Sequence, residues 1–299
     1  MSETTSETHK NKSGATTNGS GGPVPPPPPP SLPNFGNAEE SKSPEIEIES
    51  HEAVVQKLVK KLCDWGSLGG SAALVISRHV QHIPQIGPKC GIVALNMALS
   101  VFLQQPITVD EILNVARERK YTNHGEMFCA ENLKKLATHF LPNNEVQSLH
   151  SGHLRNQEFI AETLAAGDLL LVPYDSSRNF SPECLKGHKA HWAIITGIII
   201  PISQPSSNPP LPAYKNLPPG PEALQEVKKY LPVSCLHVLA LQGKSRHLSA
   251  WPLTDLVTSN ENLVQIDPER EASDLEYIVP EGGLKQGLCG KALLLKRPN

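Results

Sequence analysis

The sequence predicts an α+β domain, with helices in its first half and an antiparallel sheet in its second half. Between residue 50 and about residue 166, apolar residues recur at helical spacing. From residue 169 onward they gather in short runs rich in β-branched residues. Helical and strand-like segments do not alternate along the chain, as they would in a parallel βαβ fold. The two kinds of structure are therefore expected to be separated in sequence but packed in one domain.

The expected helices carry recognisable start and stop signals. Ser50 is expected to be the N-cap of the first helix, and Thr108 with Glu111 matches a capping box. The segment 90–102 is apolar almost all round, which predicts a central, buried helix. Further helices are expected over residues 130–140 and 156–166, the second ended by Gly167.

Short apolar runs bounded by Gly, Pro, Asn or Asp predict the strands of the second half. These runs cover residues 169–174, 192–200, 235–241, 263–266, 275–279 and 291–296. A proline-rich stretch, residues 201–232, separates two of them and is expected to be a surface insertion.

The first 49 residues are expected to form a disordered, proline-rich arm, because they hold too few apolar residues to offset the entropy lost on folding. The segment Pro23–Pro33 favours a polyproline II helix, which fits an aromatic groove on a partner. The same composition also fits an inert spacer. The folded domain is expected over residues 50–299.

Composition argues against several classes of function. The formal net charge is −3, and residues 1–50 account for it with seven Glu and three Lys, so no basic surface for nucleic acid is expected. No apolar stretch reaches the roughly 18 residues of a membrane span. The start of the chain lacks the apolar region of a secretory signal, so a cytoplasmic protein with reduced thiols is expected. The six cysteines form no zinc-binding pattern, and no cofactor is expected.

Cys90 is the candidate nucleophile. Gly87 and Pro88 predict a tight turn, after which the chain enters the buried helix with Cys90 in its first turn. Free backbone N–H groups and the helix dipole stabilise a thiolate there, so its pKa is expected below the usual ~8.5. Gly91 is expected to keep the sulfur approachable, and Gln85 to donate its amide N–H to an oxyanion. The alternative is a buried structural cysteine.

His191 is the candidate general base. It opens an apolar strand, where a rigid imidazole can stand beside a thiol. A histidine at a strand end can also be purely structural. His188 and His191 form an HxxH pair, but this pair alone makes a metal site a weak interpretation.

These motifs together resemble a known family. The pattern Gln-x-Gly-Pro-x-Cys-Gly before an apolar helix, with His-Trp at a later strand, resembles papain-like peptidases that process bacteriocin leaders. More closely, the chain is similar to the actin maturation protease family, which trims the N-terminus of newly made actin. The proline-rich arm, the stretch 242–245 and the glycine-rich segment 282–295 also match. The resemblance covers roughly residues 50–299 and implies a papain-like fold.

The resemblance also implies roles for individual residues. Cys90 would be the nucleophile, His191 the general base and acid, and Gln85 the oxyanion donor. The residue that orients the imidazole stays open between Gln242, at the end of the next strand, and Asp267, in an Asp-Pro pair further along, and strand order favours Gln242.

The implied reaction removes an N-terminal acetylated Met or Cys from immature actin through an acyl-enzyme. Lys244 and Arg246 are candidates for contact with the acidic segment of such a substrate, although solvated surface charge is the favoured account of either. Profilin, which binds both proline-rich segments and actin, is the partner implied for Pro23–Pro33. Two other functions remain open: a Cys–His acyltransferase on the same fold, and a profilin-binding adaptor with an inactive peptidase fold.

Overall fold

The computed structural model describes residues 49–68, 72–202, 214–233 and 235–298. The expected arm, residues 1–49, and its Pro23–Pro33 segment lie almost wholly outside the described residues. The helices are α1 (His51–Asp64), α2 (Cys90–Phe102), α3 (Val109–Glu118), α4 (Ala130–Phe140), α5 (Ser151–Arg155), α6 (Gln157–Ala166), α7 (Pro221–Lys228), α8 (Leu253–Glu261), α9 (Pro268–Glu271) and α10 (Gly283–Gly287). The strands are β1 (Ala72–Ser77), β2 (Val146–His150), β3 (Leu169–Ser176), β4 (Pro182–Glu183), β5 (Ala190–Ile202), β6 (Tyr214–Leu217), β7 (His237–Gln242), β8 (Ser245–Pro252) and β9 (Lys291–Leu295).

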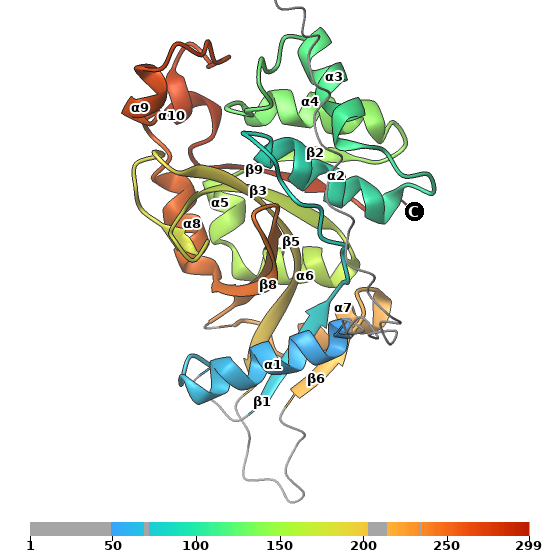
Figure 1. Ribbon diagram of the computed structural model, residues 1–299. Coiled ribbons are helices and arrows are strands. Elements are labelled where there is room, and N and C mark those ends of the chain that lie inside the picture. Colours follow the sequence, from blue (N-terminus) through green and yellow to red (C-terminus); the bar gives the residue numbers. More distant parts are fainter. Residues whose placement is uncertain (1–48, 69–71, 203–213, 234, 299) are drawn as a thin grey trace, which may run out of the picture. The chain divides into compact units, whose positions relative to one another are not determined.

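The strands form one mixed sheet, whose main path runs β2-β9-β3-β5-β1-β6 (Figure 1). The long strand β5 is its centre and pairs antiparallel with β3, β1 and β7. The α+β class is confirmed. A purely antiparallel sheet confined to the second half is wrong, because β1 and β2 come from the first half and β1 pairs with β6 in parallel.

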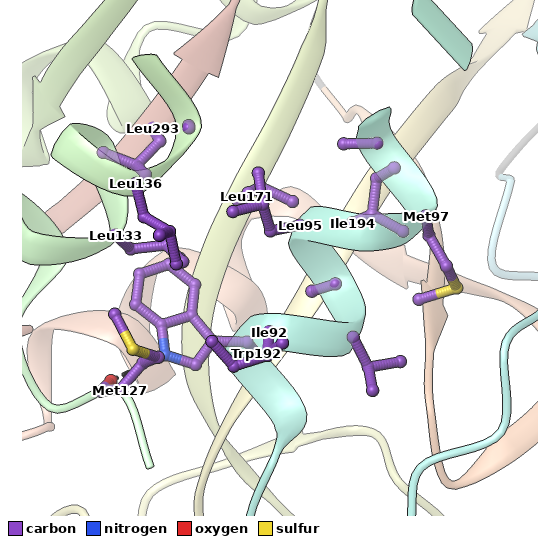
Figure 2. Packing of buried hydrophobic residues seen from close by; sticks show 14 of the residues in the cluster. Ile92, Leu95, Met97, Met127, Leu133, Leu136, Leu171, Trp192, Ile194 and Leu293 are labelled. Atoms are coloured by element: carbon purple, nitrogen blue, oxygen red, sulfur yellow. Dashed lines mark hydrogen bonds between the residues drawn. The ribbon is translucent and has the colours of Figure 1, made fainter. Parts of the chain in front are cut away.

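Alternating side chains of β5 enter two different cores. Trp192 and Ile194 pack with the apolar residues of α2 and α4, whereas Ala193 and Ile195 pack with those of α6 and α7. Figure 2 shows the Trp192 ring among Met127, Leu133 and Leu136. Period-two alternation therefore places helices on both faces of the central strand.

The predicted helices of the first half are confirmed with their ends. Ser50 accepts a hydrogen bond from the Ala53 N–H, and Thr108 with Glu111 forms the complete capping box of α3. Gly167 ends α6 with φ 103°, a left-handed conformation that favours glycine. The buried helix expected at 90–102 is α2, with Gly91 to Leu99 all buried.

Two predicted strands are wrong. Residues 263–266 and 275–279 form no strand, although Leu263, Ile266, Tyr277 and Val279 pack against the core that contains α2. Their apolar character reflects burial of irregular segments, which short apolar runs cannot distinguish from strand pairing.

The stretch 201–232 is more structured than a surface insertion. Its residues 203–213 lie outside the described residues, but β6 extends the sheet and α7 buries Ala223 and Val227 beside α6. Within the described ranges, no helix has the length and apolar character required to cross a membrane.

Candidate active site

Cys90 is the first residue of α2, as the sequence predicts. Gly87, with φ 73°, turns the chain immediately before it. The N-cap residue Lys89 makes no side-chain capping bond, so its side chain leaves the first-turn N–H groups open. The start of α2 therefore provides the positive end of a helix dipole at the sulfur.

Gly91 has a packing role that the sequence did not suggest. A Cβ atom at this position would lie 2.7 Å from Met127 Cβ and 3.1 Å from Trp192 Cδ1. The Trp192 indole is fixed in turn by donating from Nε1 to the Met127 carbonyl at 2.9 Å. Glycine after Cys90 thus allows α2 to approach β5 and the loop at residue 127.

His191 lies near the start of β5, is only 4% exposed, and bonds through Nε2 to Gln242 Oε1 at 2.9 Å. The same Oε1 atom accepts the Lys244 backbone N–H at 2.7 Å, which identifies it as the amide oxygen. His191 Nε2 must therefore carry a proton and donate. This leaves Nδ1 as the nitrogen with a free lone pair.

Asp267, the other candidate for orienting the imidazole, has a different position. It caps α9 by accepting the Glu269 N–H and lies 3.6 Å from Lys189 Nζ in an ion pair. Of the two candidates, Gln242 is the residue bonded to His191.

Gln85 lies on the segment between β1 and α2. Its backbone N–H donates to the Gly243 carbonyl at 2.8 Å, which ties this segment to the turn after Gln242. Its side-chain Nε2 donates to the Gly87 carbonyl at 2.7 Å, while Oε1 is buried without a hydrogen-bond partner. One N–H of the Gln85 side-chain amide therefore bonds to Gly87, and the second N–H is not used in that bond.

Cys90, His191 and Gln85 line one cavity of about 810 Å³. Its walls come from the loop at residues 126–128, the segment 176–192 and α9. The described part of the chain contains no cluster of three or more His, Cys, Asp or Glu side chains arranged to hold a metal, so the HxxH pair gains no third ligand there.

Burial opposes the expected thiolate–imidazolium pair. Burial raises the pKa of the Cys90 thiol, although the backbone N–H of Trp192 and the charge of Arg270 act to lower it. Burial also lowers the pKa of His191 to about 4, although the hydrogen bond that His191 donates to Gln242 acts to raise it. Both groups are therefore neutral near pH 7, and the imidazole is available as a base.

The cations at the cavity differ partly from those expected. Lys244 lines it, whereas Arg246 lines a separate cavity beside α1. Arg178, Lys189 and Arg270 also line the active-site cavity, and sequence analysis identified none of them. Arg270 lies in a charged Pro-Glu-Arg-Glu segment, a pattern typical of solvated surface. Only the tertiary structure shows that Arg270 lines the same cavity as His191.

Tyr174 is a further residue that sequence analysis missed. It is fully buried, pairs with His191 in the β3–β5 register and contacts the imidazole edge-on with ring centroids 5.9 Å apart. The hydroxyl donates to the Phe180 carbonyl at 3.0 Å. Its position in an apolar strand gave no signal beyond burial.

Comparisons with known proteins agree with these motifs. A family model described as actin maturation protease-like, C-terminal domain, matches residues 80–199, which include Cys90 and His191. Curated proteins named actin maturation protease match from mouse (39% identity, 71% of this chain, 61% of the relative) and zebrafish (35% identity, 74% of each). A fruit-fly protein of that name is 35% identical over 69% of this chain and 64% of its own length. The chain thus spans about three fifths to three quarters of these relatives. No solved structure matches it.

Proposed function

We propose that this chain, which belongs to the actin maturation protease family, is a papain-like cysteine peptidase that removes the N-terminal acetylated residue, Met or Cys, from immature actin. One observation carries the proposal. Cys90, at the open end of α2, shares a cavity with His191, whose tautomer is fixed by Gln242. The mouse and zebrafish relatives carry the name of this activity.

The proposed reaction begins with both groups neutral. His191 Nδ1 takes the thiol proton as Cys90 sulfur bonds to the scissile carbonyl carbon. The imidazolium then gives that proton to the leaving amine as the C–N bond breaks, which leaves a thioester. Water, deprotonated by Nδ1, hydrolyses the thioester and restores the thiol.

The oxyanion would be stabilised by the first-turn N–H groups of α2 and by Gln85. Gln85 uses one amide N–H on the Gly87 carbonyl, and its second N–H is the proposed donor. Gln242 orients the imidazole without charge, so the proton stays on His191 during the reaction.

The direct test uses purified protein and an N-acetylated actin N-terminal peptide with an amidated C-terminus. Mass spectrometry should detect the free acetyl-amino acid and, after acid quenching, an acyl adduct on Cys90. Transfer of the acetyl-aminoacyl group to an added amine without hydrolysis would instead indicate an acyltransferase. Absence of both products would contradict catalysis, and unprocessed actin should accumulate in cells that lack the protein.

The arm is proposed to deliver the enzyme to cytoplasmic actin that is bound to profilin. Pro23–Pro33 would occupy the aromatic groove of profilin and raise the local substrate concentration. Deleting residues 1–45 should slow processing of profilin–actin and leave cleavage of a short peptide nearly unchanged. Equal rates on profilin–actin would make the arm a spacer, and failure on the peptide would move the domain boundary proposed near residue 50.

A further inference from the structure

The active-site cavity carries an excess of positive charge. Its four cations are Arg178 and Lys189 of the segment 176–192, Lys244 after β7 and Arg270 of α9. Its carboxylates are Glu126 and Glu183. Glu126 is 1% exposed and accepts three backbone N–H bonds, so its charge is already compensated within the protein. An anionic ligand would therefore meet more cations than uncompensated carboxylates in this cavity.

Arg270 differs from the other three cations. Arg178 and Lys244 are exposed, and Lys189 is paired with Asp267 at 3.6 Å. Arg270 is half-buried, and no carboxylate within the described ranges lies at ion-pair distance from it. Partial burial strengthens the attraction between a cation and an incoming anion, because less water screens it.

Two aromatic rings fix the guanidinium. The Arg270 Cζ atom lies 5.5 Å from the centroid of Phe128 and 6.0 Å from that of Tyr277, and these rings contact each other edge to face. Cation–π contacts orient the guanidinium and leave its in-plane N–H groups free to donate. Phe128 itself lines the cavity.

The backbone that carries Arg270 is tied to the segment leading into His191. The Gln265 N–H donates to the Lys186 carbonyl at 2.7 Å, and Asp267 joins the cap of α9 to Lys189. Arg270 thus keeps a defined position relative to the imidazole. Arg270, Cys90 and His191 line the same cavity.

We propose that Arg270 is a specificity-determining residue that binds a side-chain carboxylate of the substrate peptide close to the scissile bond. The assignment rests on the proposed peptidase activity and adds the residue that recognises an acidic side chain of the peptide, through a bidentate guanidinium–carboxylate contact. Lys244 and Arg178, which are exposed, contribute only a diffuse attraction that water and salt screen.

The test compares N-acetylated, C-terminally amidated peptides that differ by Asp or Asn at one of the first three positions after the scissile bond. Amidation removes the terminal carboxylate as a competing anion. The wild-type protein should prefer Asp at one position, and Arg270→Gln should lower the Asp-to-Asn ratio of kcat/KM values about tenfold or more. Arg270→Lys should retain part of the preference, and Arg270→Glu should favour a peptide with Lys at that position. Lys285→Gln, an exposed cation on α10 that does not line the cavity, is the matched control.

The ratio of kcat/KM values isolates recognition from any general loss of rate. If Arg270→Gln still cleaves the peptides and its Asp-to-Asn ratio is unchanged, the assignment of Arg270 is overturned, whereas the proposed peptidase activity is not. An equal decrease in the Lys285→Gln variant would overturn it as well, because the effect would then be long-range. If the wild-type protein cleaves neither peptide, the proposed peptidase activity fails first, and this assignment fails with it.

Discussion

Two buried polar clusters lie at adjacent positions of the β3–β5 pair and are built in opposite ways. Asp175 pairs with Ala190, and Tyr174 with His191. Asp175 is fully buried, and its two oxygens accept the N–H groups of Leu185, Gly187 and Lys189 at 2.7–3.0 Å. This cluster is complete within the protein.

The cluster around His191 is incomplete when the hydrogen-bond partners of its buried polar atoms are compared in the same way. Gln242 Nε2 and Gln85 Oε1 are buried without a hydrogen-bond partner, and His191 Nδ1 is left as an acceptor. Unpartnered buried polar atoms are costly and are expected where a ligand or transition state completes them. The Asp175 cluster therefore holds the loop before His191, whereas the His191 cluster remains open to substrate. The difference separates a structural polar network from the one proposed to be catalytic.

The largest expected effect comes from removing the nucleophile. Cys90→Ala should lower kcat by about 10³-fold or more, because no other group in the cavity can form the thioester. The thermal midpoint should change little, since the substitution removes one sulfur from a helix that keeps its apolar contacts. Peptide turnover and thermal unfolding measure the two effects, and retained turnover would place the nucleophile elsewhere.

The protonation states of Cys90 and His191 can be followed through the rate of Cys90 alkylation. Because burial raises the thiol pKa, the thiolate fraction is small below that pKa and grows about tenfold per pH unit as the pH rises toward it. His191, with a pKa of about 4, stays neutral throughout and adds no step near neutrality. Iodoacetamide labelling of Cys90, read by peptide mass spectrometry, should therefore accelerate steadily from pH 6 to 9. A labelling rate that has already reached its plateau at pH 6 would instead indicate a thiolate–imidazolium pair.

Gln242 should affect the rate more than the fold. Gln242→Ala frees the imidazole to rotate and is expected to lower kcat/KM about 10- to 100-fold, with partial rescue by Gln242→Asn. Gln242→Glu would place a carboxylate on Nε2, stabilise the imidazolium and shift rapid Cys90 alkylation to lower pH. If the alkylation profile of the Glu variant matches that of the wild type, Gln242 does not act through His191.

Asp175 should show a stability effect of modest size. In Asp175→Asn an amide nitrogen replaces one acceptor and faces a backbone N–H donor, so the free energy of unfolding should fall by about 1–3 kcal/mol. Urea titration measures the change, and Asp255→Asn, an exposed position on α8, is the control. Equal stability of the two variants would show that the three N–H bonds do not hold the loop.

Several features follow from sequence alone because their causes are local. The start of α1, the capping box of α3 and the end of α6 depend on residues within four positions of one another. The buried helix α2 and the position of Cys90 within it follow from continuous apolar character and the preceding turn at Gly87. The family assignment also follows from the sequence, because its motifs agree in order along the chain.

Other features depend on contacts between segments far apart in sequence. Local pattern could not separate the buried, irregular segments 263–266 and 275–279 from strands, because burial and strand pairing give the same apolar signal. Strand order favoured Gln242 over Asp267, but only the β5–β7 pairing shows the bond that joins Gln242 to His191 across 51 positions. The neutral state of Cys90 and His191 was also unpredictable, because desolvation depends on what the tertiary structure packs around each group. Sequence alone identified the residues proposed to carry the chemistry, and only the tertiary structure decided their partners, protonation and surrounding charge.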